Sequence, residues 1–197
     1  MGQKGEALRQ RIVVSADQLF YQKGYESTSF SDIADDVGIS RGNFYYHFKS
    51  KDEILNAVIE TRLTEIEQML NEWSKQYTDP KQRIVEHIDI LTNHQDKIKN
   101  HGCPVGSLCA ELAKQNHSML RDANKMFAVQ RDWLTVQLKE LGLGKEARQV
   151  AMHLLARSQG IATLTNAFED QNFLRQEVKQ LKQWLGEQIQ GQNKNGN

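Results

Sequence analysis

The sequence predicts an all-α protein of about nine helices. The chain of 197 residues contains two prolines, Pro80 and Pro104. An interior proline destabilises a helix by about 3 kcal/mol, so this scarcity favours long helices. No segment alternates apolar and polar residues between Asn-Gly or Asp-Gly turns, which is the pattern of a β-hairpin. Apolar residues recur instead at the spacing of helix faces.

The charge balance limits the classes of function. Lys and Arg number 25 and Asp and Glu number 25, so the formal net charge is zero. This excludes a protein that coats nucleic acid through overall basicity. The mean hydropathy is −0.65, and no apolar run reaches the roughly 18 residues of a membrane span. The polar N-terminal residues predict no secretory signal. Because two cysteines, Cys103 and Cys109, are too few for a disulfide framework, we expect a protein of the reducing cytoplasm.

The first two predicted helices are separated by a short connection. An apolar stripe follows one face of the first helix, which ends at Gly24. The stripe consists of Leu8, Ile12, Ala16, Leu19 and Phe20. Ser29 or Ser31 begins the second helix, since either hydroxyl suits an N-cap, and Gly38 ends it.

Capping signals divide the rest of the chain. Ser50 and Glu53 have the spacing of a capping box, which opens a long helix over 52–74. Asp79 followed by Pro80 opens a helix over 80–100. Further helices are expected at about 104–114, 118–141, 145–168 and 173–189. The Gly- and Asn-rich residues 191–197 are expected to form a flexible tail.

Residues 29–48 have the layout of a helix-turn-helix motif. Ser40 is expected to cap its second helix, in which Phe44 and Phe48 form the buried face. The opposite face and flanks carry groups that can bind base edges and phosphates, on Asn43, Tyr45, Tyr46 and His47. Gly42 on the same face lets the backbone come close to a partner. The cations Arg41, Lys49 and Lys51 stand beside them, with no acidic residue between positions 40 and 51. This local surface is predicted to bind nucleic acid.

The run TSFSDIADDVGISRGNFYYHFKSKDE, residues 28–53, resembles the DNA-binding domain of the TetR family (TetR/AcrR type) of transcriptional regulators. The resemblance covers about the first 60 residues, and it implies that the third helix enters the DNA major groove. The implied DNA contacts are Thr28, Ser29, Ser40, Arg41, Gly42, Asn43, Tyr45, Tyr46, His47, Lys49 and Lys51. Asn43 stands where a small hydroxyl residue is common, so no base preference is predicted.

The resemblance also implies that the chain has two functional domains. A helix-turn-helix domain is expected over 1–51 and a ligand-binding and dimerisation domain over 52–190, with the 52–74 helix connecting them. A short recognition helix reads only about four or five base pairs, so specific binding requires a homodimer on a palindromic operator. The expected dimer surface comprises Ala151, Leu155, Ser158, Ala162 and Thr165 on one helix and Leu174, Val178, Leu181, Leu185 and Ile189 on the next. Alternatively, these stripes cover the core of their own chain.

A small-molecule effector is implied as well, one that weakens DNA binding by favouring another conformation. Segment 101–111 resembles a Gly-Cys segment found in a subset of the family. Pro104 at the first helical position places Cys103 at the N-cap, where the helix dipole favours the thiolate. Cys103 is thus a candidate thiol for sensing electrophiles or oxidants; alternatively, it packs as a small apolar residue. The other effector candidates, each with an ordinary core or surface role as its alternative, are Cys109, Met126, Phe127, Trp133, His153 and Arg157.

No metal or other cofactor is predicted. His87, His94 and His101 recur every seven residues, about 10.5 Å apart along a helix, which is too far to share one ion. A pairing of Cys103 with His101 on a metal stays open.

No phosphate loop, Gly-x-Ser-x-Gly elbow or His-Glu-x-x-His motif indicates an enzyme. The resemblance to the TetR family implies a repressor released from its operator by a small molecule. The alternative is an architectural DNA-binding protein that needs no ligand.

Overall fold

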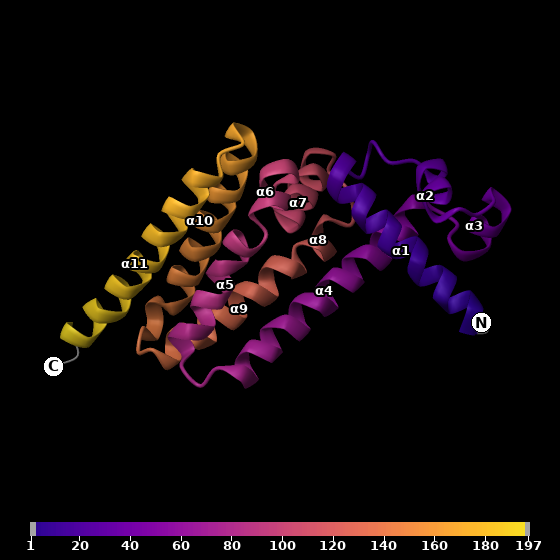
Figure 1. Cartoon of the computed structure of the whole chain (residues 1–197). Helices are drawn as coiled ribbons and strands as arrows, with labels where there is room; N and C mark the ends of the chain where they lie inside the picture. Colours follow the sequence, from indigo (N-terminus) through magenta and orange to yellow (C-terminus); the bar gives the residue numbers. More distant parts are fainter. Residues whose placement is uncertain (1–2, 196–197) are drawn as a thin grey trace. The chain divides into compact units, whose positions relative to one another are not determined.

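The computed structural model describes the backbone of residues 3–195 and the side chains of residues 3–191. All regular secondary structure in this part of the chain is helical (Figure 1). The all-α prediction is confirmed. Each helix between residues 3 and 195 is too short or too polar to cross a membrane.

Eleven α-helices and one 3-10 turn make up the described chain. They are α1 (Gln3–Lys23), α2 (Phe30–Val37), α3 (Arg41–His47), α4 (Lys51–Gln76), α5 (Pro80–Asn93), α6 (Gln95–His101), α7 (Pro104–Lys114), α8 (Leu120–Ala123), α9 (Lys125–Glu140), the 3-10 turn (Gly144–Glu146), α10 (Ala147–Phe168) and α11 (Gln171–Asn195). These cover the same segments as the nine predicted helices, two of which are interrupted. The 80–100 helix is divided at His94, whose φ of −117° and ψ of 24° leave the helical region. The 118–141 helix is divided at Asn124, a residue type that favours helix ends.

The C-terminal helix is longer than predicted. Gly191 does not end α11, which spans 25 residues and continues to Asn195. An interior glycine disfavours a helix by only about 1 kcal/mol relative to alanine, too little to end a long helix by itself. The backbone of residues 191–195 is helical, and the predicted flexibility of this tail stays a prediction. Residues 196–197 of that predicted tail lie outside the described residues.

The chain folds into two compact units. The first comprises residues 1–65 and 104–126, and the second comprises residues 66–103 and 127–197. The residues of α4 are thus shared between the units. The helix-turn-helix domain predicted over residues 1–51 lies within the first unit. Helices α7 and α8 belong to this unit too, although they are distant from it in sequence.

Local capping interactions define the helix-turn-helix. Ser29, rather than Ser31, begins α2: the amide of Asp32 donates to Ser29 Oγ at 3.2 Å, and the amide of Ser29 donates to the Asp32 carboxylate at 2.7 Å. Gly38 ends the helix in the left-handed conformation, with a φ of 73°, which glycine adopts without steric cost. Ser40 then begins α3 by accepting a hydrogen bond from the amide of Asn43 at 3.3 Å. The predicted caps at Gly38 and Ser40 are confirmed.

Aromatic packing holds α3 on this motif. The rings of Phe44 and Phe30 lie 5.2 Å apart in an edge-to-face arrangement, which joins α3 to α2. Phe44 and Phe48 are each 1% exposed, so their predicted burial is confirmed. Helix α1 is tied to α2 by polar contacts, since Arg11 donates to the Val37 carbonyl at 2.8 Å and Ser15 donates to the Asp36 carboxylate at 2.6 Å.

The second unit has an apolar core built by α5, α6, α9, α10 and α11. The stripes predicted to face a second copy lie in this core or are otherwise buried in the single chain. The buried members are Ala151, Leu155, Ser158, Ala162, Thr165, Leu174, Val178, Leu181 and Leu185, and Ile189 packs partly buried against them. Burial within one chain leaves these residues little surface to offer a second copy, and helices α10 and α11 pack on each other.

Replacing a core residue of α11 is expected to destabilise the protomer itself. Leu181 is 0% exposed within one chain, so Leu181→Ala should lower the free energy of unfolding by about 2–5 kcal/mol. Urea unfolding at several protein concentrations measures this, with the exposed neighbour Gln180→Ala as control. Equal unfolding midpoints for the two variants would contradict the packing described here.

Candidate functional site

Helix α3 presents a buried side and an exposed side. Tyr46 is 66% exposed and Tyr45 is 45% exposed. Arg41, Gly42 and Asn43 at the start of the helix are exposed as well. The exposed side therefore combines hydroxyl, amide and guanidinium groups, which can hydrogen-bond to base edges or phosphates.

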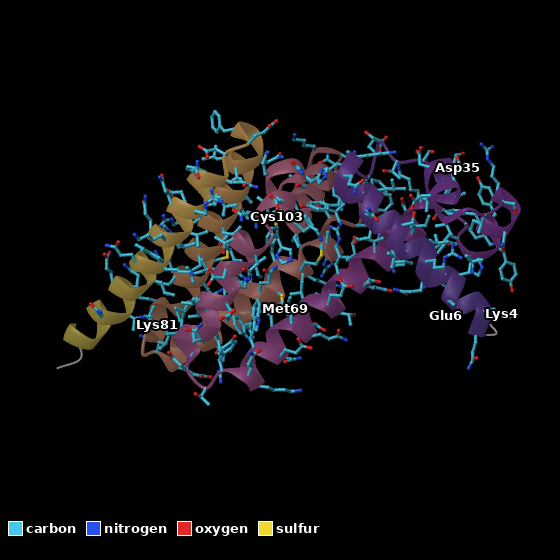
Figure 2. The ribbon with its side chains drawn as sticks, in the orientation of Figure 1. Lys4, Glu6, Asp35, Met69, Lys81 and Cys103 are labelled. Carbon is cyan, nitrogen blue, oxygen red and sulfur yellow. The ribbon has the colours of Figure 1, made fainter. Side chains whose placement is uncertain are left out.

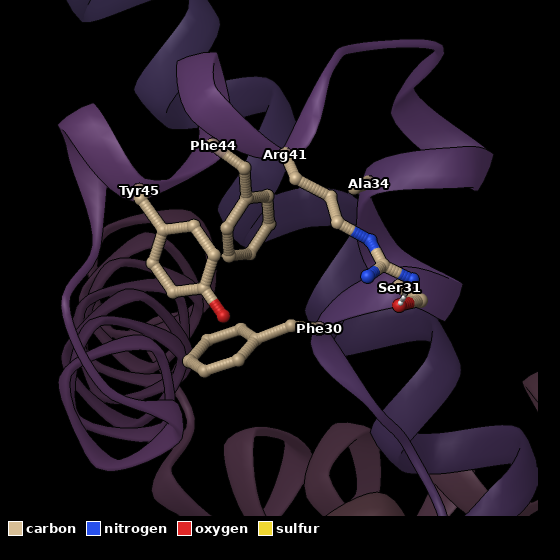
Figure 3. A pocket seen from close by; sticks show the side chains of 6 residues that line it. All are labelled: Phe30, Ser31, Ala34, Arg41, Phe44 and Tyr45. Carbon is tan, nitrogen blue, oxygen red and sulfur yellow. Dashed lines mark hydrogen bonds between the residues drawn. The ribbon is translucent and has the colours of Figure 1, made fainter.

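The cationic side chains of this surface differ in their contacts within the protein and in their exposure to solvent. Arg41 donates from Nη2 to Ser31 Oγ at 2.9 Å, which orients its guanidinium along α2 (Figure 3). Lys49 donates from Nζ to the Tyr45 carbonyl. The amine of Lys51 donates to the Glu26 carbonyl at 3.2 Å and lies 4.3 Å from the centre of the Tyr25 ring. Arg41 and Lys49 remain exposed, whereas Lys51 is half-buried.

The small cavity between α2 and α3 is not a ligand site. It is lined by Phe30, Ser31, Ala34, Arg41, Phe44 and Tyr45 (Figure 3) and has a volume of about 50 Å³. This volume is far below the roughly 300–1,000 Å³ of an ordinary ligand pocket. The Phe44 ring lies between the side chains of Tyr45 and Arg41 at this cavity (Figure 3).

Two of the predicted DNA-contact residues have local structural roles. Thr28 is 1% exposed and donates its hydroxyl to the Gly24 carbonyl at 2.8 Å. This hydrogen bond turns the hydroxyl into the protein, and a contact between Thr28 and DNA stays a prediction. Ser29 is exposed, but its hydroxyl donates to Asp32 at 2.6 Å. Hydrogen bonds from Ser29 lower the pKa of the Asp32 carboxyl, so the cap is ionised at neutral pH.

His47 and Arg9 flank an open groove beside α3. His47 is half-buried, and its Nδ1 has no hydrogen-bond partner among the described residues. The guanidinium of Arg9 lies 4.8 Å from the centre of the Phe48 ring, and both side chains line the groove, which has a volume of about 430 Å³. Arg9 was not among the predicted residues, because its position in the sequence of α1 gives no sign that it faces the end of α3.

The predicted effector residues have different surroundings. Cys103 is the last residue of the second unit before α7 begins at Pro104. It is half-buried and accepts a hydrogen bond from Gln159 Nε2 at 3.4 Å (Figure 2). His153 is exposed, with its ring 4.5 Å from that of Trp184, and Arg157 pairs with Glu177 at 3.3 Å. Phe127 is half-buried in the same unit. Cys109 and Met126 belong to the first unit and are buried. Neither cysteine forms a disulfide.

Trp133 belongs to an aromatic cluster in the second unit. Its ring stacks on that of His87 at 6.3 Å and lies 6.1 Å from that of Trp73. The indole N–H of Trp133 donates to Ser74 Oγ at 2.9 Å. His87 Nε2 lies 3.0 Å from Gln130 Oε1, while Nδ1 is buried without a hydrogen-bond partner in the described chain. The sequence did not reveal this cluster, since its members come from α4, α5 and α9.

Burial governs the protonation of His87. The side chain is buried within the apolar layer of the second unit, and desolvation lowers the pKa of its imidazole from the usual value. His87 is therefore neutral at pH 7, which leaves Nδ1 or Nε2 as an acceptor. In the described residues, no group of three or more His, Cys, Asp or Glu side chains could hold a metal ion.

Two family models match the chain. The model described as "Bacterial regulatory proteins, tetR family" matches residues 12–58. The model described as "Transcriptional regulator LmrA/YxaF-like, C-terminal domain" matches residues 80–180. The two matches cover the helix-turn-helix and most of the helices that follow it.

Known proteins are similar over most of the chain. An uncharacterised HTH-type transcriptional regulator of Lactococcus lactis subsp. lactis is 30% identical over 178 residues, which is 88% of this chain and 91% of the relative. The HTH-type transcriptional repressor DhaR of a Mycobacterium species is 22% identical over 153 residues, with 76% and 75% of the two chains covered. The crystal structure of a TetR transcriptional regulator from Legionella pneumophila has a TM-score of 0.80 and 26% identity, with 93% of this chain and 97% of the other covered.

The protonation of His87 predicts a pH dependence of stability. In the unfolded chain His87 binds a proton below a pKa of about 6.5, whereas the folded form does not until a lower pH. Stability should therefore be retained above pH 6.5 and lost as the pH falls below it. Between pH 7.5 and 5.5, the free energy of unfolding should fall by up to about 1.4 kcal/mol more in the wild type than in His87→Phe. Urea unfolding at both pH values measures the difference, and an identical decrease in both proteins would refute it.

Proposed function

The chain belongs to the TetR family of bacterial regulatory proteins, and on this premise we propose that it is a cytoplasmic repressor that binds a palindromic operator as a homodimer. A small-molecule effector releases it from the DNA. Proteins of this family are DNA-binding transcriptional regulators, not enzymes. The name of the relative DhaR, a transcriptional repressor, supports repression as the mode of regulation.

The exposed side of α3 is the observation that carries this proposal. Tyr45, Tyr46 and Asn43 extend from a helix whose other side is fixed by Phe44. Two neighbouring exposed tyrosines on this seven-residue helix combine an apolar ring with a polar hydroxyl, which is typical of residues at interfaces. A major groove suits them, because it is wide enough for a helix and presents both hydrogen-bonding edges and thymine methyl groups.

Electrostatics favour the same partner. The exposed cations Arg41 and Lys49 flank the face, and Arg9 lines the neighbouring groove. Since the whole chain has zero formal charge, attraction to DNA depends on this local arrangement. Binding should weaken as salt rises, because each neutralised phosphate releases counterions.

The proposed dimer surface is the exposed side of α10, instead of the stripe that the protomer buries. Every fourth residue from Met152 to Phe168 faces outward, and Phe168 is 75% exposed. Ala156 and Gly160 in the middle of this line are small, and a second helix can approach them closely. A two-fold pair of chains would cover this apolar line and present two copies of α3 to an operator with inverted repeats.

The second unit is the proposed site of effector binding, and Cys103 is the proposed sensing thiol for an electrophilic or oxidant effector. Its half-burial and its place immediately before α7 support this role. Trp133 and its partner His87 offer a second contact region for an effector in the same unit. Binding there must favour a conformation with lower operator affinity.

Removal of an exposed α3 side chain tests DNA recognition. Tyr46→Ala should weaken binding to DNA fragments selected by the wild type about tenfold, which corresponds to the loss of one good contact of about 1.4 kcal/mol. Thermal stability should change little, because the Tyr46 side chain is exposed. Fluorescence anisotropy with labelled duplexes measures the affinity, and Val14→Ala, an exposed apolar residue on α1, is the control. The assignment of α3 fails if both variants bind as the wild type does.

Alkylation tests the sensing thiol. Treatment with N-ethylmaleimide should weaken operator binding by the wild type and by Cys109→Ser about tenfold or more, within the usual range of allosteric coupling. Cys103→Ser should resist the reagent. Cys109 is the matched control because it is buried in the first unit. Equal sensitivity of Cys103→Ser and the wild type would rule out Cys103 as the sensor.

A further inference from the structure

A segment from the C-terminal half of the sequence is built into the DNA-binding unit. Residues 104–126 lie within the stretch that matches the C-terminal family model, yet they form one compact unit with residues 1–65. Helix α7 of this segment packs on α1. The helix-turn-helix is therefore held in part by residues that the sequence assigns to the ligand-binding domain.

Glu111 on α7 makes the most specific of these contacts. Its carboxylate accepts hydrogen bonds from two successive backbone amides of the turn between α1 and α2: Tyr25 N–H at 2.9 Å and Glu26 N–H at 2.8 Å. The residues joined are 86 and 85 positions apart in the sequence. Such charge-assisted hydrogen bonds are about twice as strong as neutral ones.

The turn is shaped to receive this carboxylate. Gly24 has a φ of 91°, a conformation that favours glycine, and an added Cβ would lie 3.3 Å from both carboxylate oxygens of Glu111. Any larger residue at position 24 would therefore press on Glu111 as well as strain the backbone. Both features indicate a turn that depends on a close approach of α7.

Two residues at the start of α4 also contact the turn between α1 and α2, through the side chain of Tyr25 and the carbonyl of Glu26. Tyr25 donates its hydroxyl to Asp52 at 2.6 Å, and Lys51 donates to the Glu26 carbonyl at 3.2 Å. Burial raises the pKa of Tyr25, and the hydrogen bond to Asp52 raises it further, so the hydroxyl remains a donor at neutral pH. His117, which follows α7, packs edge-on against the Tyr25 ring at 5.4 Å.

The position of this turn determines where α2 begins. Thr28 donates to the Gly24 carbonyl, and Ser29 caps α2 directly afterwards. Helix α2 in turn holds α3 through Phe30 and Phe44. A short chain of contacts thus leads from Glu111 to the exposed side of α3.

A buried arginine anchors the start of α7 to the same unit. Arg62 of α4 is 7% exposed, donates to Asp17 of α1 at 2.5 Å and donates to the Pro104 carbonyl at 2.7 Å. Helix α7 is therefore attached at its first residue through Arg62 and near its end through Glu111. A displacement of α7 must change one of these attachments.

We propose that Glu111 is a positioning residue for operator recognition, which fixes the turn between α1 and α2 and thereby the orientation of α3. This inference rests on the proposed DNA-binding function. It assigns to segment 104–126 the task of holding the DNA-binding helices in their reading position. Any effector that displaces α7 would act on operator affinity through the Glu111 carboxylate.

The variant Glu111→Gln tests the proposal, because a carboxamide has one acceptor oxygen and leaves one of the two amides without a partner. Affinity for a duplex selected by the wild type from random DNA should fall about tenfold, the factor that corresponds to one hydrogen bond of about 1.4 kcal/mol. Affinity for random duplex should stay within about twofold. The control is Glu65→Gln, since Glu65 is an exposed residue of α4 in the same unit. Loss of a negative charge alone would strengthen DNA binding in both variants, so a decrease confined to Glu111→Gln has the opposite sign to the charge effect.

Backbone amide signals distinguish failure of this inference from failure of the proposed function. By NMR, the amide protons of Tyr25 and Glu26 in the wild type should resonate downfield and exchange slowly, and in Glu111→Gln at least one should move upfield and exchange about tenfold faster. Unprotected wild-type amides would overturn the proposal without the need for any variant. The proposal is also overturned if the amide signals move in Glu111→Gln but this variant binds the operator as tightly as Glu65→Gln does. If the wild type selects no DNA at all, the proposed function fails, and the positioning role fails with it. The amide data then still report whether the amides of Tyr25 and Glu26 donate hydrogen bonds to Glu111.

Discussion

The edge-to-face contact between Phe30 and Phe44 is the interaction on which the rest of the account depends. Helix α3 has seven residues, far fewer than the dozen or more that a helix needs to be stable alone in water. Its existence therefore relies on packing against α2 and on the Ser40 cap. The same packing determines which side chains face outward, so structure and proposed recognition are fixed by one contact.

Local features of the sequence were sufficient to predict most of the fold. The caps at Gly38 and Ser40, the Pro80 start of α5 and the buried faces of α1 and α3 follow from interactions within a few residues. The exposed residues of α3 were predicted for the same reason. The orientation of Thr28 was not predicted: it has the right neighbours in sequence for a DNA contact, but its hydroxyl donates to the carbonyl of Gly24, four residues earlier in the same turn.

The stripes predicted to form a dimer surface show what helical periodicity leaves open. The spacing of Leu174, Val178, Leu181 and Leu185 predicts an apolar face on α11, and that face exists. Periodicity does not say whether its partner is another helix of the same chain or a second copy. The His87, Trp73 and Trp133 cluster illustrates the same point, since it joins three helices that no sequence spacing connects. The division of the chain into units that interleave in sequence likewise becomes visible only in three dimensions.

The central claim is that two copies of the chain present α3 to a two-fold symmetric DNA site. Selection of bound fragments from random DNA, followed by footprinting and by measurement of the protein-to-DNA ratio, tests this directly. The account predicts one short sequence repeated in inverted orientation, with two chains on each fragment. Recovered fragments without a shared sequence, or an asymmetric site occupied by one chain, would contradict it.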